Sequence, residues 1–255
     1  MRKLAILLTV LACLLAGCGT PPEPTEPPRP MPEVNPYTPD DFEYDGQRLK
    51  CLTGEALPGV DVSYYQGQID WEAVAADGMK FAMIRVGYRG YVDGTIYPDE
   101  NARANIEGAL AAGLEVGVYF FSQALTPQEA AREAAFTVSF IEGCDITMPV
   151  VFDWEHVTDE TARTAGMHDM DTLTDCAMAF MDVAAAAGYT PMVYFNRHQS
   201  QTLFDMSDLR DYPFWLALYD APMSFPYRIA MWQYSAEGTV TGISTPVDLN
   251  LYFPE

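Results

Sequence analysis

The chain has few basic residues and few of the residues that commonly bind metals or act as nucleophiles. Lysine and arginine total 14, against 36 aspartates and glutamates, so the net charge is −22. A chain of this charge repels nucleic acid and anionic lipid, and we expect neither as an electrostatic partner. Its three histidines, His156, His168 and His198, lack metal-ligand spacing, and no Cys-His or Ser-His pair stands out. The sequence therefore predicts no metal and no cofactor.

Long apolar runs are also scarce, and the run near the N-terminus is too short to cross a bilayer comfortably. It extends from Leu4 to Ala16, follows Arg2 and Lys3, and leads into Leu15-Ala16-Gly17-Cys18. A basic start, a short apolar core and small residues before a cleavage site are typical of a secretory signal. The last four residues resemble a bacterial lipobox, in which the cysteine after the cut carries a lipid. We expect residues 1–17 to be removed and Cys18 to anchor the protein to the membrane by lipid alone.

The segment after Cys18 is unlike a folded domain. Residues 20–41 are rich in proline and glutamate, a composition that buries little apolar area and favours extended geometry. We therefore predict a disordered tether over residues 18–45 and a single domain over 46–255, with residues 42–58 assigned to no element. Three cysteines remain once the signal peptide and the lipid-bearing Cys18 are set aside, and this odd number leaves at least one thiol without an intramolecular partner. They are Cys51, Cys144 and Cys176.

The domain has the rhythm of alternating helices and strands. Helical patterns end in glycine just before apolar strands at Gly78, Gly113, Gly143 and Gly188. Strands are predicted near residues 60, 83, 118, 151, 193, 216, 231 and 248, and only the gaps between the first five, with about 25 to 40 residues each, hold a helix comfortably. This indicates an α/β fold, an irregular TIM-like (β/α)5β3 barrel beginning near residue 59. An open doubly wound sheet is the alternative, but no glycine-rich phosphate loop follows the first strand.

Two carboxylates end the fourth predicted strand. Asp153 and Glu155 follow the apolar run Met148–Phe152, and their spacing of two places both side chains on one face, with α-carbons about 6.6 Å apart. Mutual repulsion raises one pKa of such a pair, which suits a general acid, although acids also occur where a strand simply runs into solvent. Asp61 on the first strand and Asp248 on the eighth are expected across the barrel mouth. Two opposed pairs of acids form a geometry for holding a sugar.

Six short strings are spread over the whole domain: Gly59-Val60-Asp61-Val62-Ser63, Phe81-Ala82-Met83-Ile84-Arg85-Val86-Gly87-Tyr88, Gly117-Val118-Tyr119-Phe120-Phe121, Phe152-Asp153-Trp154-Glu155, Trp232-Gln233-Tyr234-Ser235 and Val247-Asp248-Leu249-Asn250. Together and in this order, they resemble glycoside hydrolase family 25, the Chalaropsis-type lysozymes. The resemblance implies that the protein hydrolyses the β-1,4 bond between N-acetylmuramic acid and N-acetylglucosamine. It further implies peptidoglycan glycan strands as the partner. From the lipobox and the tether we expect a place in the cell envelope facing the wall, and we expect the protein to be a monomer.

By the same resemblance, Glu155 matches the proton donor, Asp153 the assisting carboxylate, and Asp61 and Asp248 the supporting acids. Asp153 would orient the substrate's 2-acetamido group, or an acid across the pocket would activate water, so the stereochemical outcome stays open. Aromatic rings at strand ends suit the apolar faces of sugars, although each ring has a core-packing alternative. We expect Arg85 to pair with the acids. The predicted sugar-binding residues are Tyr64, Arg85, Tyr119, Tyr194, Trp215 and Trp232.

Two other functions stay open. Chitinases and endo-N-acetylglucosaminidases of family 18 also end their fourth strand in Asp-x-Glu. They carry further aspartates upstream, however, where this chain has Met148 and Val151. A wall-binding module without catalysis is the other possibility, and the presence of all four acids argues against it.

Overall fold

The computed structural model describes residues 29–167 and 169–254. The predicted signal peptide over 1–17 and the lipidated Cys18 lie outside the described residues. Among the helices that are described, none has the length and apolar character needed to cross a membrane.

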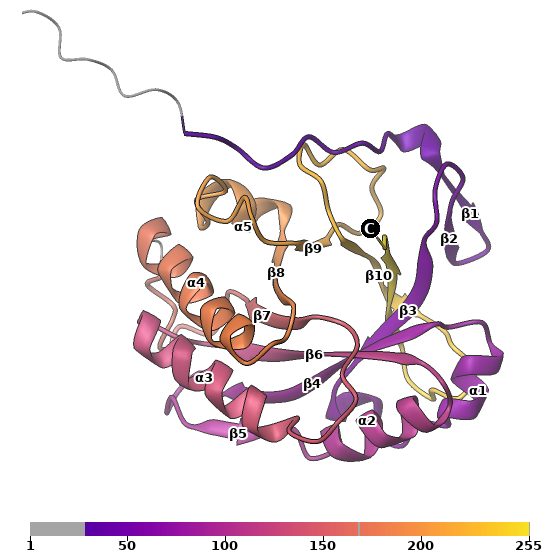
Figure 1. The fold of residues 1–255 in the computed structure, drawn as a ribbon, viewed down its shortest axis with the longest axis horizontal. Coiled ribbons are helices and arrows are strands. Elements are labelled where there is room, and N and C mark those ends of the chain that lie inside the picture. The colour runs from indigo at the N-terminus through magenta and orange to yellow at the C-terminus, as the bar shows by residue number, and fades with distance from the viewer. Residues whose placement is uncertain (1–28, 168, 255) are drawn as a thin grey trace, which may run out of the picture.

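A closed barrel of eight strands forms the body of the domain (Figure 1). Each strand pairs with the next along the chain, and the last pairs with the first. A short additional strand, β5 (Ile96–Pro98), pairs with the outer end of the second barrel strand. The predicted closed barrel is confirmed, with a strand at each predicted position. The barrel strands are β3 (Leu57–Val62), β4 (Phe81–Arg89), β6 (Glu115–Ser122), β7 (Val150–Trp154), β8 (Pro191–Asn196), β9 (Phe214–Ala217), β10 (Met231–Gly238) and β11 (Val247–Tyr252).

The last strand runs against the others. Strands β3 to β10 are parallel to their barrel neighbours, whereas β11 is antiparallel to both β10 and β3. The start of β11 therefore lies at the rim where the parallel strands end. In this register Asp248 stands directly opposite Asp61.

Each of the first five barrel strands is followed by a helix, as the (β/α)5β3 prediction requires. The four glycines predicted to end helices all have positive φ, between 80° and 97°, which glycine adopts without a steric penalty. Thr126 caps its helix by accepting from the Glu129 amide. The helices are α1 (Trp71–Ala76), α2 (Ala102–Ala111), α3 (Pro127–Phe140), α4 (Met170–Ala186) and α5 (Arg197–Thr202), with short 3-10 turns η1 (Pro39–Asp41) and η2 (Tyr64–Gln66).

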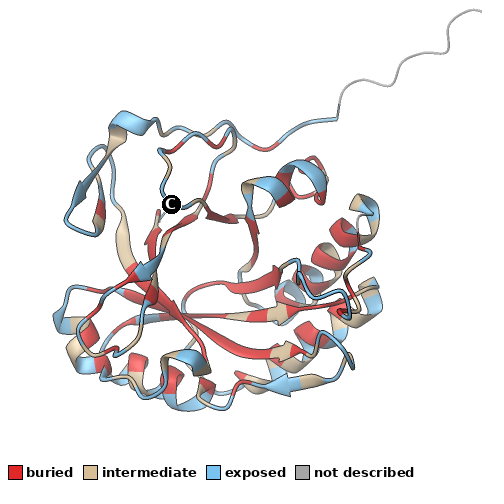
Figure 2. Cartoon of the chain, turned by 180° about the vertical axis from the view of Figure 1, so that it is seen from behind, coloured by how far each residue is buried: buried red, intermediate tan, exposed pale blue. Residues whose placement is uncertain are grey.

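The strands are buried on both faces, one inside the barrel and one against the helices (Figure 2). Strand β7 shows how alternation divides them. Val151 belongs to the apolar cluster inside the barrel, whereas Phe152 faces outward and its ring lies 5.4 Å from that of Phe180 on α4. Asp153 continues the inward face of Val151 and so reaches the mouth of the barrel.

The N-terminal segment covers the side of the barrel that has no helices. Residues 33–35 form backbone hydrogen bonds with residues 226 and 228, and a hairpin of β1 (Phe42–Asp45) and β2 (Arg48–Cys51) follows. Residues 33–45 are thus packed on the domain, whereas the sequence places them in the tether. The unassigned stretch from 42 to 58 holds this hairpin, the connection after it and the first two residues of β3.

Residues 33–45 pack on the domain because the outer face of the last barrel strands is apolar. Trp232 on β10 points out of the barrel, and the Phe42 ring lies 5.1 Å from it in an edge-to-face contact. Phe42 also lies 6.1 Å from the ring of Phe253. Without a helix after β9 or β10, these rings require another cover, and the hairpin supplies it.

We expect Phe42→Ala to lower the free energy of unfolding by about 2 kcal/mol, because it uncovers this part of the outer face. Urea denaturation measures the change. Glu43→Ala, at an exposed position on the same strand, is the control and should leave the free energy of unfolding nearly unchanged. Equal effects of both substitutions would show that the hairpin does not contribute through Phe42.

Candidate active site

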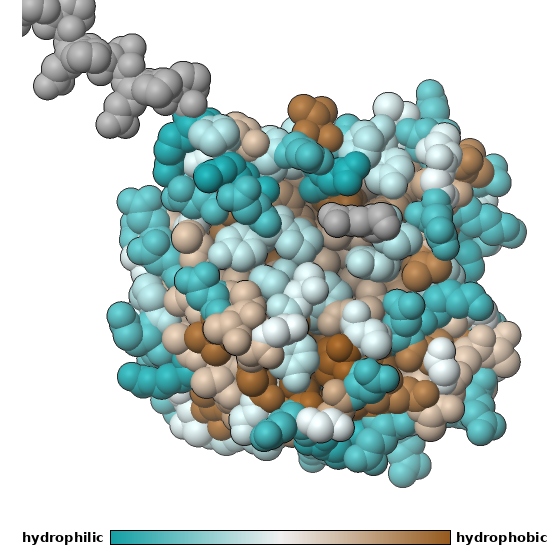
Figure 3. All heavy atoms as spheres, viewed as in Figure 1, coloured by the Kyte–Doolittle hydropathy of each residue, from teal (hydrophilic) through white to brown (hydrophobic). Residues whose placement is uncertain are grey.

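A pocket of about 730 Å³ opens at the rim where the parallel strands end and β11 begins. Carboxyls, tyrosines and amide groups line it, and every barrel strand contributes at least one lining residue. Polar side chains also cover much of the molecular face seen in Figure 3, in keeping with the high charge of the chain. The site is therefore a polar cavity set on an apolar barrel.

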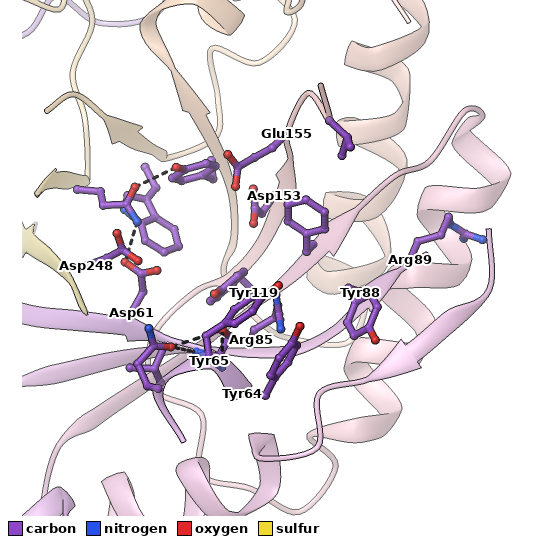
Figure 4. A pocket seen from close by; sticks show the side chains of 18 of the residues that line it. Asp61, Tyr64, Tyr65, Arg85, Tyr88, Arg89, Tyr119, Asp153, Glu155 and Asp248 are labelled. Carbon is purple, nitrogen blue, oxygen red and sulfur yellow. Dashed lines mark hydrogen bonds between the residues drawn. The ribbon is translucent and has the colours of Figure 1, made fainter. Parts of the chain in front are cut away.

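The four predicted acids meet in this pocket (Figure 4). Asp153 and Glu155 come from the end of β7, and Asp61 and Asp248 come from the paired strands β3 and β11 on the opposite wall. Asp61 and Asp153 are almost fully buried, at 5% and 4% exposure, whereas Glu155 and Asp248 are partly open to the cavity.

Burial raises the pKa of every acid in the group. It raises the pKa of Glu155 to about 7, with a further contribution from the charge of Asp61. The pKa of Asp248 rises to about 9, through burial and then the charges of Asp61 and Glu155. Burial and the neighbouring Glu155 hold the pKa of Asp153 well above its usual range. A carboxyl that titrates near neutrality, as Glu155 does, is suited to donate a proton and then take one back.

Burial raises the pKa of Asp61 as well, but only to about 6, because amide hydrogen bonds offset part of the effect of burial. Gln233 and Asn250 each donate a side-chain N–H to its Oδ2 at 2.8 Å. Trp215 donates its indole N–H to Asn250 Oδ1 at 2.9 Å, and Tyr194 donates its hydroxyl to Gln233 Oε1 at 2.9 Å. Trp215 and Tyr194 thus line the pocket and also orient the amides that hold Asp61.

Asp153 has an unused hydrogen-bonding atom at the pocket. Among the described residues, its buried Oδ1 has no hydrogen-bond partner. Buried carboxyl oxygens are normally paired, so an unpaired one that lines a cavity is suited to a ligand N–H or O–H group.

Arg85 lines the pocket as predicted, and its charge lowers the pKa of Asp153, but its hydrogen-bonded ion pair is not with one of the four acids. It pairs with Asp99, which accepts from Arg85 Nε at 3.0 Å and from the Tyr64 amide at 3.0 Å. Strand β5 folds back antiparallel to the end of β4. Asp99, the residue after β5, therefore lies next to Arg85 on β4. The guanidinium also lies 4.9 Å from the Tyr64 ring centre and 5.3 Å from that of Tyr88.

Most of the predicted aromatic residues reach the pocket, and one does not. Tyr64, Tyr119, Tyr194 and Trp215 line the cavity. Trp232 was wrongly placed, because it faces the outer core and donates its indole N–H to the Leu218 carbonyl. The next residue on β10, Gln233, points into the pocket instead. Residues that line the pocket without having been predicted include Tyr65, Tyr88, Tyr91, Tyr219 and Gln233.

No signal in the sequence distinguishes the faces of β10, since its first four residues are all buried. Tyr88 belongs to one of the strings that resemble family 25, and this membership could have predicted its place in the pocket. Across residues 29–167 and 169–254, no group of three or more histidine, cysteine or acidic side chains is arranged to hold a metal ion.

Opposed carboxyls at the mouth of a barrel suit the cleavage of a glycosidic bond, and the class that fold and site define is the glycoside hydrolases. A sequence model of glycosyl hydrolases family 25 matches residues 60–243. The chain belongs to this family.

Similar proteins agree with this assignment. Lysozyme M1 of Streptomyces globisporus is 30% identical over 206 residues, which cover 77% of this chain and 67% of the relative. The autolytic lysozyme of Clostridium acetobutylicum is 26% identical over 196 residues, or 76% of this chain and 55% of that protein. The autolysin LytC of Streptococcus pneumoniae, solved with a synthetic peptidoglycan ligand, aligns with a TM-score of 0.68 at 26% identity. That match covers 78% of this chain and 47% of LytC, so the chain spans only about half of these longer relatives.

The raised pKa of Asp248 predicts a cost in stability at high pH. The folded state holds this proton more tightly than the unfolded state, so the stabilisation is complete below about pH 4 and is lost as pH rises toward 9. Asp248→Asn removes the titration. It should raise the melting temperature relative to wild type more at about pH 8 than at about pH 5. An equal difference at both pH values would contradict the raised pKa.

Proposed function

We propose that the protein hydrolyses the β-1,4 bond between N-acetylmuramic acid and N-acetylglucosamine in peptidoglycan. The observation that carries the proposal is the set of four acids in one pocket, with Glu155 titrating near neutrality. Family membership and the lysozyme names of the relatives support the choice of substrate. The exposed tyrosines at the rim, such as Tyr65 and Tyr91, suit the apolar faces of a glycan strand.

In this mechanism Glu155 is the general acid. Its proton passes to the glycosidic oxygen as the bond to the anomeric carbon breaks. The carbonyl oxygen of the substrate's 2-acetamido group attacks the same carbon, which closes a cyclic intermediate. Glu155, now ionised, takes a proton from the water that opens the ring, and the enzyme returns to its starting state.

Asp153 orients the acetamido group for this attack. Its unpaired Oδ1 supports the role, because it is free to accept the acetamido N–H. Asp61 and Asp248, on the opposite wall, hold the sugar and set the charge around Glu155. Attack from within the substrate gives a product with retained configuration at the anomeric carbon. Inversion would instead assign water activation to an acid across the pocket.

Digestion of purified peptidoglycan by the whole protein tests the bond cleaved. We expect new reducing ends on N-acetylmuramic acid, identified by borohydride reduction and mass spectrometry. Reducing ends on N-acetylglucosamine would replace this proposal with a family 18-like activity. Binding to peptidoglycan without new ends would make the protein a wall-binding module.

Glu155→Gln should lower turnover at least 100-fold, because the amide keeps the side-chain volume but has no proton to donate. Asp153→Asn should lose most activity as well, through poorer orientation of the acetamido group. Residual activity above about a tenth of wild type in Glu155→Gln would remove Glu155 from the role of acid. A matched melting temperature confirms that the variant is folded.

We also propose that the mature chain is anchored at Cys18 by a lipid. The proline- and glutamate-rich residues that precede Arg29 would serve as the tether that lets the barrel reach the wall, since Arg29 itself forms ion pairs with Asp205 and Asp208 on the domain. The lipobox-like Leu15-Ala16-Gly17-Cys18 supports the proposal. Wild-type protein made in a bacterial host should enter the detergent phase on Triton X-114 partition, and Cys18→Ser should not. Wild-type protein that stays in the aqueous phase would contradict lipidation.

A further inference from the structure

Glu155 follows directly after Trp154, the last residue of β7. Pairing with β8 ends at Asp153, and pairing with β6 ends at Trp154. Glu155 therefore stands beyond the sheet, where strand pairing no longer fixes the backbone. Its position depends on other groups.

Gln123, the residue after β6, holds this backbone from one side. Its side chain is fully buried, and its Nε2 donates to the Glu155 carbonyl at 2.9 Å. The other end of the amide, Oε1, accepts the hydroxyl of buried Thr164, which lies in the loop between β7 and α4. A carbonyl can only accept, so the NH2 end of Gln123 must face Glu155.

Gln199, in the first turn of α5, holds the strand end from the other side. It is 2% exposed, and its Nε2 donates to the Trp154 carbonyl at 2.7 Å. Its Oε1 accepts the backbone N–H of Asn196 at 2.8 Å. Because a backbone N–H can only donate, the orientation of this amide is fixed as well.

We propose that Gln123 and Gln199 are positioning residues that fix the Glu155 carboxyl at the reacting bond by clamping consecutive carbonyls of its backbone. The inference rests on the proposed function of Glu155 as general acid. One buried amide follows β6 and the other lies on α5, and they bind the carbonyls of Trp154 and Glu155 at the point where strand pairing ends. Displacement of a catalytic group by about 1 Å costs on the order of 100-fold in rate, so such a clamp has a measurable consequence.

Gln123→Leu tests the clamp, because it keeps most of the volume and removes the donor to Glu155. We expect kcat to fall by about 10- to 100-fold with KM within about twofold, since the lining of the sugar site is unchanged. Thr164→Val, which removes only the hydroxyl that holds the amide in place, should give a smaller loss of the same kind and serves if Gln123→Leu does not fold.

A matched control is Thr174→Val. Thr174 is 1% exposed, donates to the Met170 carbonyl at 2.8 Å and accepts the Asp205 amide at 2.9 Å, all outside the pocket. It should lower the melting temperature as Gln123→Leu does but leave kcat within about twofold. Equal kcat in folded Gln123→Leu and wild type, or an equal fall in the Thr174 variant, would overturn the proposal.

A measurement without substrate separates this proposal from the proposed function. The Glu155 carboxyl can be titrated by NMR in wild type and in Gln123→Leu. A loosened Glu155 meets more water, so its pKa should fall below the wild-type value of about 7. The groups that face it, Asp61, Asp153, Asp248, Tyr194 and Tyr219, are the same in both proteins.

In a working enzyme, the same change moves the basic limb of the kcat/KM profile to lower pH. If the wild-type protein cleaves no peptidoglycan, the proposed function is wrong. The NMR titration would still test whether Gln123 fixes the position of Glu155. An unchanged pKa of Glu155 in both Gln123→Leu and Thr164→Val would overturn the clamp, whatever the activity.

Discussion

Closure of the barrel by an antiparallel last strand is the constraint on which the site depends. Because β11 runs against β3, its first residues lie at the rim where the parallel strands end. A parallel last strand would place Asp248 at the other end of the barrel. The same register brings Asn250 to Asp61, where its amide stabilises the carboxylate. The antiparallel direction of β11 therefore brings Asp248 into the pocket and also places Asn250 where it donates a hydrogen bond to the Asp61 carboxylate.

The cluster of acids is costly to the folded state, and the structure shows how the cost is reduced. Asp248, with a pKa of about 9, keeps its proton at neutral pH, which lowers the repulsion within the pocket. Asp61 instead receives two amide hydrogen bonds, and its pKa of about 6 is lower than those of Glu155 and Asp248. The apolar layers inside and outside the barrel stabilise the fold and so offset the unfavourable free energy of the buried acids.

The outer surface of the barrel is covered in two ways. Helices cover the first five strands, and the N-terminal hairpin covers the strands that have none. The hairpin thus does the work of a helix on that side. This explains why residues 33–45, despite their prolines and charge, pack on the domain: the rings of Trp232 and Phe253 require cover, and Phe42 provides it.

The sequence by itself determined the strand positions, the glycines that end helices and the placement of Asp153 and Glu155 on one face of a strand. These follow from local rules, because side-chain alternation and backbone φ depend on neighbours along the chain. It did not determine the choice between Trp232 and Gln233 at the pocket, since β10 is buried on both faces and hydrophobicity gives no direction. Nor did it reveal that Arg85 pairs with Asp99, or that Gln123 and Gln199 hold the end of β7. Those partners are decided only in the tertiary structure, because sheet closure and the return of loops bring together groups that no local pattern connects.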